Sequence, residues 1–116
     1  MAEVKKWCVK HEGTILVVEG GGKLLGYATV LSHCKEDGTS DEVAHTYALI
    51  ADLVVTKSAS RQGIGKTLLD ACEAIARKCG QNDLRIGVLA ANDGARHTYR
   101  DFGFTEHHLT LKKRLS

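Results

Sequence analysis

The sequence contains no proline, and it lacks the long apolar segments that mark membrane and secreted proteins. No apolar run reaches the roughly 18 residues that a membrane-spanning helix needs. Residues 1–6 read Met-Ala-Glu-Val-Lys-Lys and lack the apolar stretch of a secretory signal. We therefore expect a cytoplasmic protein that has no membrane partner.

The net charge is small, and the cysteines are widely spaced. The net charge of +2 is too small to indicate nucleic acid or an anionic membrane as a partner. None of the four cysteines (Cys8, Cys34, Cys72 and Cys79) forms a C-x-x-C pair, which argues against a zinc site. We expect no metal, and we interpret the cysteines as small buried groups in a reducing compartment.

The chain has 116 residues, which is enough for one domain with a single hydrophobic core. It shows no internal repeat, linker or low-complexity tract, so residues 1–116 are interpreted as one domain. Residues 14–19 and 23–33 are predicted strands of an antiparallel hairpin, joined by a turn at Gly20, Gly21 and Gly22.

A long strand is predicted over residues 45–56, after a polar loop at residues 34–42. Its apolar run is nearly continuous, which indicates a central strand that is buried on both faces. Asp52 interrupts this run. A carboxylate at such a place must be hydrogen-bonded, exposed at a bulge, or functional.

The second half of the chain alternates helices and strands. Apolar residues at helical spacing predict a helix over residues 64–79, and Gly80 ends it. Residues 84–91 follow as a strand parallel to the preceding one, because a helix connects the two. A short helix at residues 95–101 and a final strand at residues 109–115 complete a mixed α/β sheet.

The chain is organised around the turn between the long strand and the first helix. Gly63 and Gly65 open the helix, and glycines at a helix N-terminus let backbone N–H groups approach a phosphate. Gly65, Lys66 and Thr67 also match the end of a nucleotide-binding Walker A loop, but its first glycine would fall at Ser60. A P-loop domain is also usually longer than this chain.

A second motif lies in residues 92–104. Its defined positions are Asn92, Ala95, Tyr99, Gly103 and Phe104, which match the pattern N-x-x-A-x-x-x-Y-x-x-x-G-F. Together with the glycine turn at the right distance, this motif resembles the GNAT superfamily of acyl-CoA N-acyltransferases. The resemblance covers residues from about 14 to 115.

The family's pyrophosphate loop reads Q/R-x-x-G-x-G/A. In this sequence that register runs from Ser60 to Gly65, so Ser60 stands where the family usually has Arg or Gln. The departure removes one side-chain contact and leaves the backbone cradle, which uses N–H groups.

The resemblance implies a GNAT-like fold, a twisted mixed sheet whose central parallel strands splay apart around the acyl-CoA. Family members usually begin with a strand and one or two helices that build part of the acceptor pocket. Only about a dozen residues precede the first clear hairpin here, so the N-terminal helices are expected to be largely missing. An open acceptor side completed by a second subunit, in a homodimer, is a further expectation.

The resemblance also implies roles for particular residues. The expected cofactor-binding residues are Leu53, Val54 and Val55 for the pantetheine arm, Arg61, Gln62, Gly63, Ile64, Gly65 and Lys66 for the pyrophosphate, and Asn92 for the cofactor arm. For Arg61 and Lys66 we weigh two alternatives equally: the side chain contacts phosphate, or it is simply solvated.

Two residues are candidates for catalysis. Tyr99 would lie by the thioester sulfur, where a phenol can give a proton to the leaving thiolate; the alternative is a helix tyrosine packed against the sheet. Asp52, one residue before the pantetheine segment, is the candidate base, since an alkylammonium with a pKa near 10.4 must lose a proton before it attacks. A structural carboxylate at a bulge is the alternative.

We therefore predict an acetyltransferase that moves an acetyl group from acetyl-CoA to a primary amine of a small molecule or peptide. Its co-substrate is acetyl-CoA, and Tyr99 is its general acid. The alternative is a catalytically degenerate GNAT domain that binds acyl-CoA as a sensor or partner-binding module. A third class, a nucleotide-binding protein, is opposed by the incomplete Walker loop.

Overall fold

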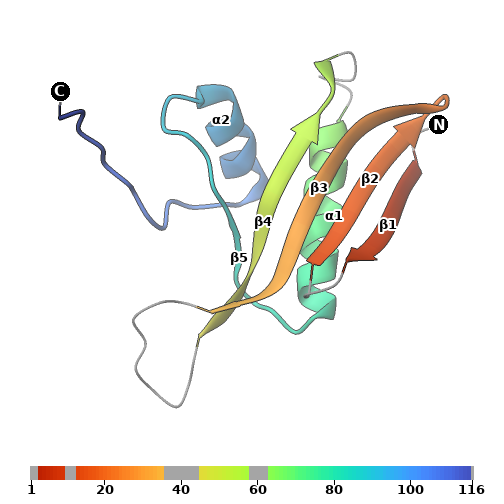
Figure 1. The fold of residues 1–116 in the computed structure, drawn as a ribbon, viewed down its shortest axis with the longest axis horizontal. Coiled ribbons are helices and arrows are strands. Elements are labelled where there is room, and N and C mark those ends of the chain that lie inside the picture. The colour runs from red at the N-terminus through yellow and green to blue at the C-terminus, as the bar shows by residue number, and fades with distance from the viewer. Residues whose placement is uncertain (1–2, 10–12, 36–44, 58–62, 116) are drawn as a thin grey trace.

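The computed structural model describes residues 3–9, 13–35, 45–57 and 63–115. Its strands form one mixed sheet in the order β1-β2-β3-β4-β5 (Figure 1). They are β1 (Glu3–Val9), β2 (Gly13–Gly20), β3 (Lys23–Lys35), β4 (Thr46–Val55) and β5 (Leu84–Ile86). The first four strands pair antiparallel, and β5 lies parallel to β4. The predicted mixed sheet is confirmed, with the parallel pair at the edge of the described sheet and not at its centre.

The N-terminal residues form an edge strand instead of helices. β1 pairs with β2 along its whole length, from Glu3 opposite Glu19 to Val9 opposite Gly13. The first helix in the described part of the chain is α1 (Ile64–Lys78), so the expected loss of N-terminal helices is confirmed. The predicted hairpin of β2 and β3 is confirmed too. It turns at Gly21 and Gly22, whose φ angles of 58° and 75° favour glycine.

β4 carries a bulge in its middle. Thr29 of β3 pairs with Asp52, but the next residue, Val30, pairs with Ile50, so Ala51 is an extra residue. Ala48 and Ile50 are buried before the bulge, and Leu53 and Val55 pack against the same core after it. The extra residue therefore changes the alternation of the strand and keeps its apolar side chains on the helix side.

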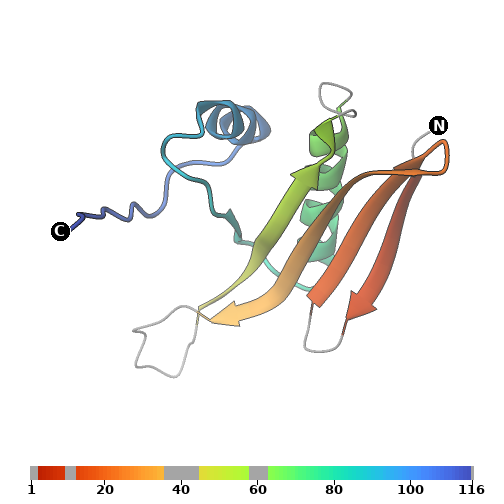
Figure 2. The same cartoon turned by 45° about the horizontal axis from the view of Figure 1, so that its top comes forward.

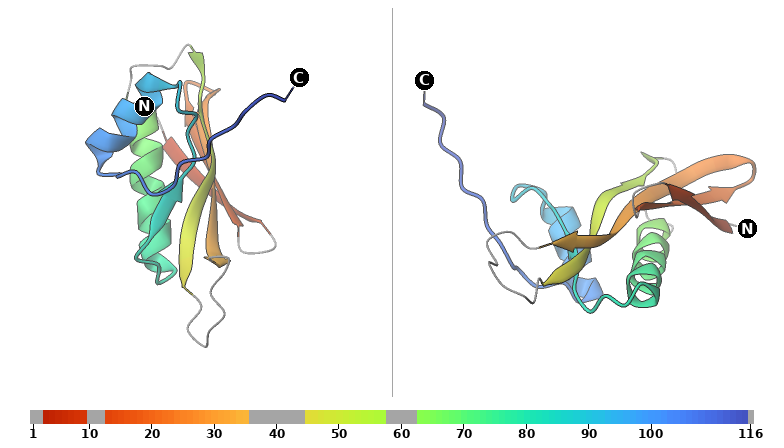
Figure 3. Two further views of the ribbon diagram at one scale, coloured as in Figure 1. Left: turned by 90° about the vertical axis from the view of Figure 1, so that its left-hand side faces the viewer. Right: turned by 60° about the horizontal axis from the view of Figure 1, so that its bottom comes forward.

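Helix α1 covers one face of the sheet, and α2 (Asp93–Phe102) lies on the same side (Figures 2 and 3). The buried side chains of α1 recur at helical spacing and supply half of the core: Ile64, Leu68, Leu69, Cys72, Ile75 and Ala76. Burial raises the pKa of the Cys72 thiol to about 12, so this cysteine is a neutral core group, as predicted. The same prediction is wrong for Cys79, which is exposed at the end of α1, and Cys34 is half-buried. Neither helix is long and apolar enough to span a membrane in the described residues.

Gly26 of β3 lies directly beneath α1, and its substitution tests this packing. A Cβ atom there would stand 2.7 Å from the Val54 carbonyl oxygen and 3.2 Å from side-chain atoms of Ile64 and Leu68. We expect Gly26→Ala to lower the free energy of unfolding by about 1–3 kcal/mol, as overpacking does, in urea denaturation. Gly13→Ala is the matched control, since its Cβ would make only ordinary contacts at 3.5 Å and beyond. Equal stability of the two variants would contradict the packing described here.

The C-terminal part departs from the prediction. The strand expected over residues 84–91 is formed only at Leu84–Ile86, and the strand expected over residues 109–115 is wrong. Leu109, Leu111 and Leu115 are 68%, 84% and 88% exposed. Alternating side chains make a segment suitable for a strand, but a strand also needs a neighbouring edge. Here the pairing of β5 ends at Ile86, and the last residues extend away from the domain (Figure 1).

Candidate functional site

The candidate site begins where β4 and β5 separate. The two strands share three residue pairs, from Ala48 opposite Leu84 to Ile50 opposite Ile86. The bulge at Ala51 follows directly, and β4 continues to Val55 without a strand beside it on that side in the described chain. The backbone N–H and C=O groups of Leu53 and Val55 on that edge are therefore placed to pair with an extended ligand. Those of Val54 face β3 instead, because Thr56 N–H donates to the Leu25 carbonyl oxygen and alternate residues of an antiparallel strand face the same neighbour.

The N-terminus of α1 lies next to this edge. Gly63 is the N-cap residue with φ 75°, and no side chain in the described residues caps the helix. The first turn of α1 contains no acidic residue, so its free N–H groups and the helix dipole suit an anion. A Cβ atom on Gly65 would lie 3.8 Å from Val55, so packing within the chain does not require this glycine.

Two predicted phosphate-binding residues, Arg61 and Gln62, lie outside the described residues. Gly63, Ile64, Gly65 and Lys66 form the turn and the start of the helix as predicted. Ile64 is buried in the core, so any contact of this residue with a phosphate would be through its backbone.

Asn92 is the N-cap residue of α2. Its side-chain Oδ1 accepts a hydrogen bond from the backbone N–H of Ala95 at 3.1 Å. This bond explains the spacing of Asn and Ala in the second motif by helix capping alone. The Nδ2 group of the same side chain takes no part in that bond. It can still donate to a ligand, and so the predicted cofactor contact stays a prediction.

Tyr99 lies on the face of α2 that packs against the core. Its ring meets Phe104 edge to face, with centroids 6.0 Å apart. Leu53 and Val55 of β4 pack against the same hydrophobic core, so Tyr99 and the unpaired part of β4 lie on the same face of the sheet. Burial raises the pKa of Tyr99 above its ordinary value of 10.0, which keeps the phenol protonated at neutral pH.

Asp52 lies on the other face of the sheet. It is exposed, it follows the bulge, and it pairs in register with Thr29. The neighbours of Thr29 in β3, Ala28 and Val30, are buried beneath α1, so Thr29 and Asp52 point to the opposite face. Asp52 and Tyr99 therefore approach the region between β4 and β5 from opposite sides.

A cavity of about 530 Å³ lies between the two helices, a size typical of small-molecule sites. Its lining residues are Lys66, Leu69, Asp70, Glu73, Thr98, Asp101 and Phe102. Lys66 belongs to the first turn of α1, so this end of the cavity adjoins the glycine turn. Sequence analysis missed Thr98 and Phe102, although the two residues are four apart and so share one face of α2.

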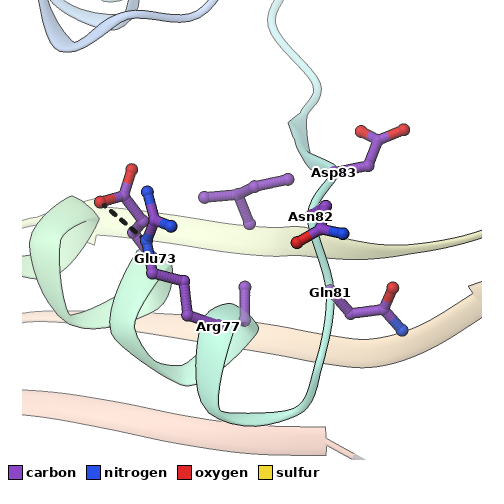
Figure 4. A pocket seen from close by; sticks show the side chains of 7 residues that line it. Glu73, Arg77, Gln81, Asn82 and Asp83 are labelled. Carbon is purple, nitrogen blue, oxygen red and sulfur yellow. Dashed lines mark ion pairs between the residues drawn. The ribbon is translucent and has the colours of Figure 1, made fainter.

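A smaller cavity of about 110 Å³ lies at the other end of α1, where β5 begins (Figure 4). Glu73 and Arg77, two of its lining residues, form an ion pair at 3.7 Å. This cavity is too small for an acyl-CoA. In the described part of the chain, no group of three or more His, Cys, Asp or Glu side chains could hold a metal ion.

The comparisons with known proteins agree with this geometry. The model of the acetyltransferase (GNAT) family matches residues 1–104. The chain belongs to this family. It is accordingly an N-acetyltransferase by family, and members of the family use acetyl-CoA as the acetyl donor. Among curated proteins, none matches this chain.

Several solved structures share the fold. A mutant of the BH1408 protein from Bacillus halodurans superposes with a TM-score of 0.82 at 19% identity, over 92% of this chain and 68% of that one. A putative acetyl transferase from Pyrococcus furiosus gives 0.74 at 27% identity, over 91% and 68%. An aminoglycoside N-acetyltransferase, AAC(6')-Iy in complex with CoA, gives 0.74 at 16% identity, over 90% and 77%. The predicted GNAT-like fold is confirmed.

Proposed function

We propose that this GNAT protein transfers the acetyl group of acetyl-CoA to a primary amine of a small molecule or peptide by direct attack. One observation supports the proposal. The unpaired edge of β4, the N-terminus of α1 and the half-buried Tyr99 all lie on the helix-covered side of the sheet. The aminoglycoside acetyltransferases among the similar structures support a small-molecule amine as one possible acceptor class.

The residues of this site fit acetyl-CoA. The N–H groups that follow Gly63 suit its pyrophosphate, and the backbone groups of Leu53 and Val55 suit the amides of its pantetheine arm. The Val54 backbone faces β3, so a contact of this residue would be through its side chain. When bound, acetyl-CoA supplies the acetyl group as an activated thioester. The backbone at the Ala51 bulge, beyond the last β5 pair, is suited to stabilise negative charge on the acyl oxygen.

The two ionisable side chains divide the proton transfers between the two faces of the sheet. Asp52 takes the proton of the incoming ammonium on the exposed face, because a protonated amine has no lone pair with which to attack. Tyr99 donates its proton to the departing sulfur on the helix side. Its raised pKa keeps it in the donating form.

Binding and turnover are tested in one series. Isothermal titration with acetyl-CoA, with ATP as the control ligand, is expected to show binding of acetyl-CoA alone. Free thiol release with a pooled library of amines then tests transfer. Binding without thiol release would favour a degenerate domain that senses acyl-CoA, and absence of binding would overturn the proposal.

Replacement of Asp52 tests its role as the base. We expect Asp52→Asn to lower kcat/KM for the amine about 100-fold at neutral pH, since an amide cannot accept the proton. The deficit should shrink as the pH approaches the pKa of the acceptor, where the amine is already deprotonated. The measurement is thiol release across a pH series. A deficit that is the same at every pH, or none, would identify Asp52 as a structural carboxylate.

We further propose a cytoplasmic location, a homodimer, and no nucleic-acid or membrane partner. Analytical ultracentrifugation of the purified chain tests the homodimer. The sedimentation coefficient of a monomer at micromolar concentration would contradict it.

A further inference from the structure

Four side chains join β4 to β5 at the end opposite the glycine turn. We call His45, Tyr47, Asp83 and Arg85 the β4–β5 clamp. Nε2 of His45 lies 2.9 Å from Oδ2 of Asp83, and Arg85 donates to both oxygens of Asp83, from Nε at 3.2 Å and from Nη2 at 3.0 Å. The Arg85 guanidinium also lies over the Tyr47 ring, 3.9 Å from its centroid.

Arg85 is at the centre of this group. Its side chain is only 19% exposed, whereas that of Arg77 on α1 is 74% exposed. A guanidinium loses much of its hydration at such a site, so the paired carboxylate and the ring face matter more than they would on the surface. The arginine also holds the pKa of Asp83 below its usual range, with a smaller contribution from His45.

The clamp lies where the backbone connection between the strands is weakest. β4 and β5 share only three residue pairs, while β3 and β4 pair along most of their length. The beginning of β5 is fixed further by the buried Gln81, whose Nε2 donates to the Ser32 carbonyl oxygen at 2.7 Å. The backbone N–H of Ala48 also donates to the Asp83 carbonyl oxygen at 2.8 Å.

This short junction sets the direction in which the chain continues beyond Ile86. The chain after β5 is not paired with β4, and it leads to Asn92 and to α2, which carries Tyr99. A small rotation of β5 about its three pairs would displace both residues relative to the unpaired edge of β4. The position of a general acid is sensitive to shifts of this kind.

We propose that the β4–β5 clamp positions the acetyl-CoA cleft, by which we mean the region where β4 and β5 separate. Arg85 is the positioning residue that fixes the direction in which β5 leaves β4. This inference rests on the proposed function, because it assigns the clamp to the same cleft. The clamp residues do not touch the reacting atoms. Their effect is transmitted through β5 and residues 87–92.

Arg85→Met tests the proposal, because methionine keeps much of the apolar stem and loses the charge and the planar group. We expect a roughly ten-fold loss in acetyl-CoA affinity and in kcat, with faster amide hydrogen exchange over residues 84–92. Tyr47→Phe keeps the ring face and should behave as the wild type. Arg77→Met is the matched control, since this arginine is 74% exposed and its ion pair lies within α1.

The outcomes separate this inference from the proposed function. If the wild type binds acetyl-CoA but transfers no acetyl group, the proposed activity fails. The clamp is still tested in that case, by comparing acetyl-CoA affinity and amide hydrogen exchange between Arg85→Met and the wild type. Wild-type affinity and exchange in a folded Arg85→Met variant would overturn the inference. Should that variant not fold, Tyr47→Leu removes the ring face and leaves Arg85 and Asp83 paired, and the same two readouts decide.

Discussion

Tyr99→Phe is expected to lower kcat for acetyl transfer about 100-fold, the usual scale of general acid catalysis, and to leave the affinity for acetyl-CoA nearly unchanged. The phenol is the group on the helix side of the cleft that can protonate the leaving thiolate. Phenylalanine keeps the ring and so keeps the edge-to-face contact with Phe104 and the packing against the core. Single-turnover thiol release is the measurement, because slow product release would hide a change in the chemical step.

The pH profile adds a second test of the same residue. Burial raises the pKa of Tyr99, so the donating form persists as the pH rises and is lost only above its ordinary value of 10.0. The wild-type rate should therefore fall only at a pH above that value, where the phenol loses its proton. The Tyr99→Phe variant should lack that fall. Full wild-type kcat in the variant would assign Tyr99 to packing alone.

The local parts of this fold could be predicted from the sequence. The spacing of apolar residues and the position of Gly80 predicted a helix at residues 64–79, and α1 spans Ile64–Lys78. The glycine turn and the β2–β3 hairpin were predictable for the same reason, since φ angles above zero favour glycine at those positions. Helix periodicity and turn conformation depend on residues that are close in the sequence, so they can be predicted without knowledge of the fold.

Features that depend on pairing between distant residues could not be predicted. The bulge at Ala51 lies inside an apolar run that looks continuous, and only the register against β3 reveals it. The leucines of residues 109–115 alternate as in a strand, yet no adjoining edge exists for them in the described chain. Arg85 gave no signal either, because its role depends on Asp83 and Tyr47 meeting across two strands.

Asn92 shows how one motif can have two explanations. The sequence analysis assigned it to the cofactor through the resemblance, and the structure shows that its Oδ1 caps α2. Asparagine is a common N-cap residue, and its side chain usually accepts a hydrogen bond from a backbone N–H two or three residues later. The capping role of Asn92 could therefore have been predicted from the sequence. This motif therefore supports the helix boundary directly, and it supports the cofactor site only through the family.

Gly63→Asp is expected to weaken acetyl-CoA binding by at least about 100-fold, because it places a carboxylate beside the pyrophosphate, and like charges at such distances repel strongly even with partial screening. Gly63 adopts φ 75°, and a Cβ atom there would meet no described residue within 4 Å. An aspartate at the N-cap of α1 also suits the helix dipole. We therefore expect the variant to fold, and isothermal titration with acetyl-CoA measures the loss.

Two matched variants separate charge from backbone strain. Gly63→Asn has nearly the shape of the aspartate without its charge, and asparagine tolerates a positive φ, so it should retain much more of the affinity than Gly63→Asp. Gly80→Asp introduces the same residue at φ 82° beyond the other end of α1, again with nothing within 4 Å of its Cβ, and should bind as the wild type does. Because Gly63 and Gly80 share conformation and open surroundings, a loss confined to Gly63→Asp can only come from a negative charge at the N-terminus of α1. If both aspartate variants bind normally, the pyrophosphate lies elsewhere, and the glycine turn is only a means of starting the helix.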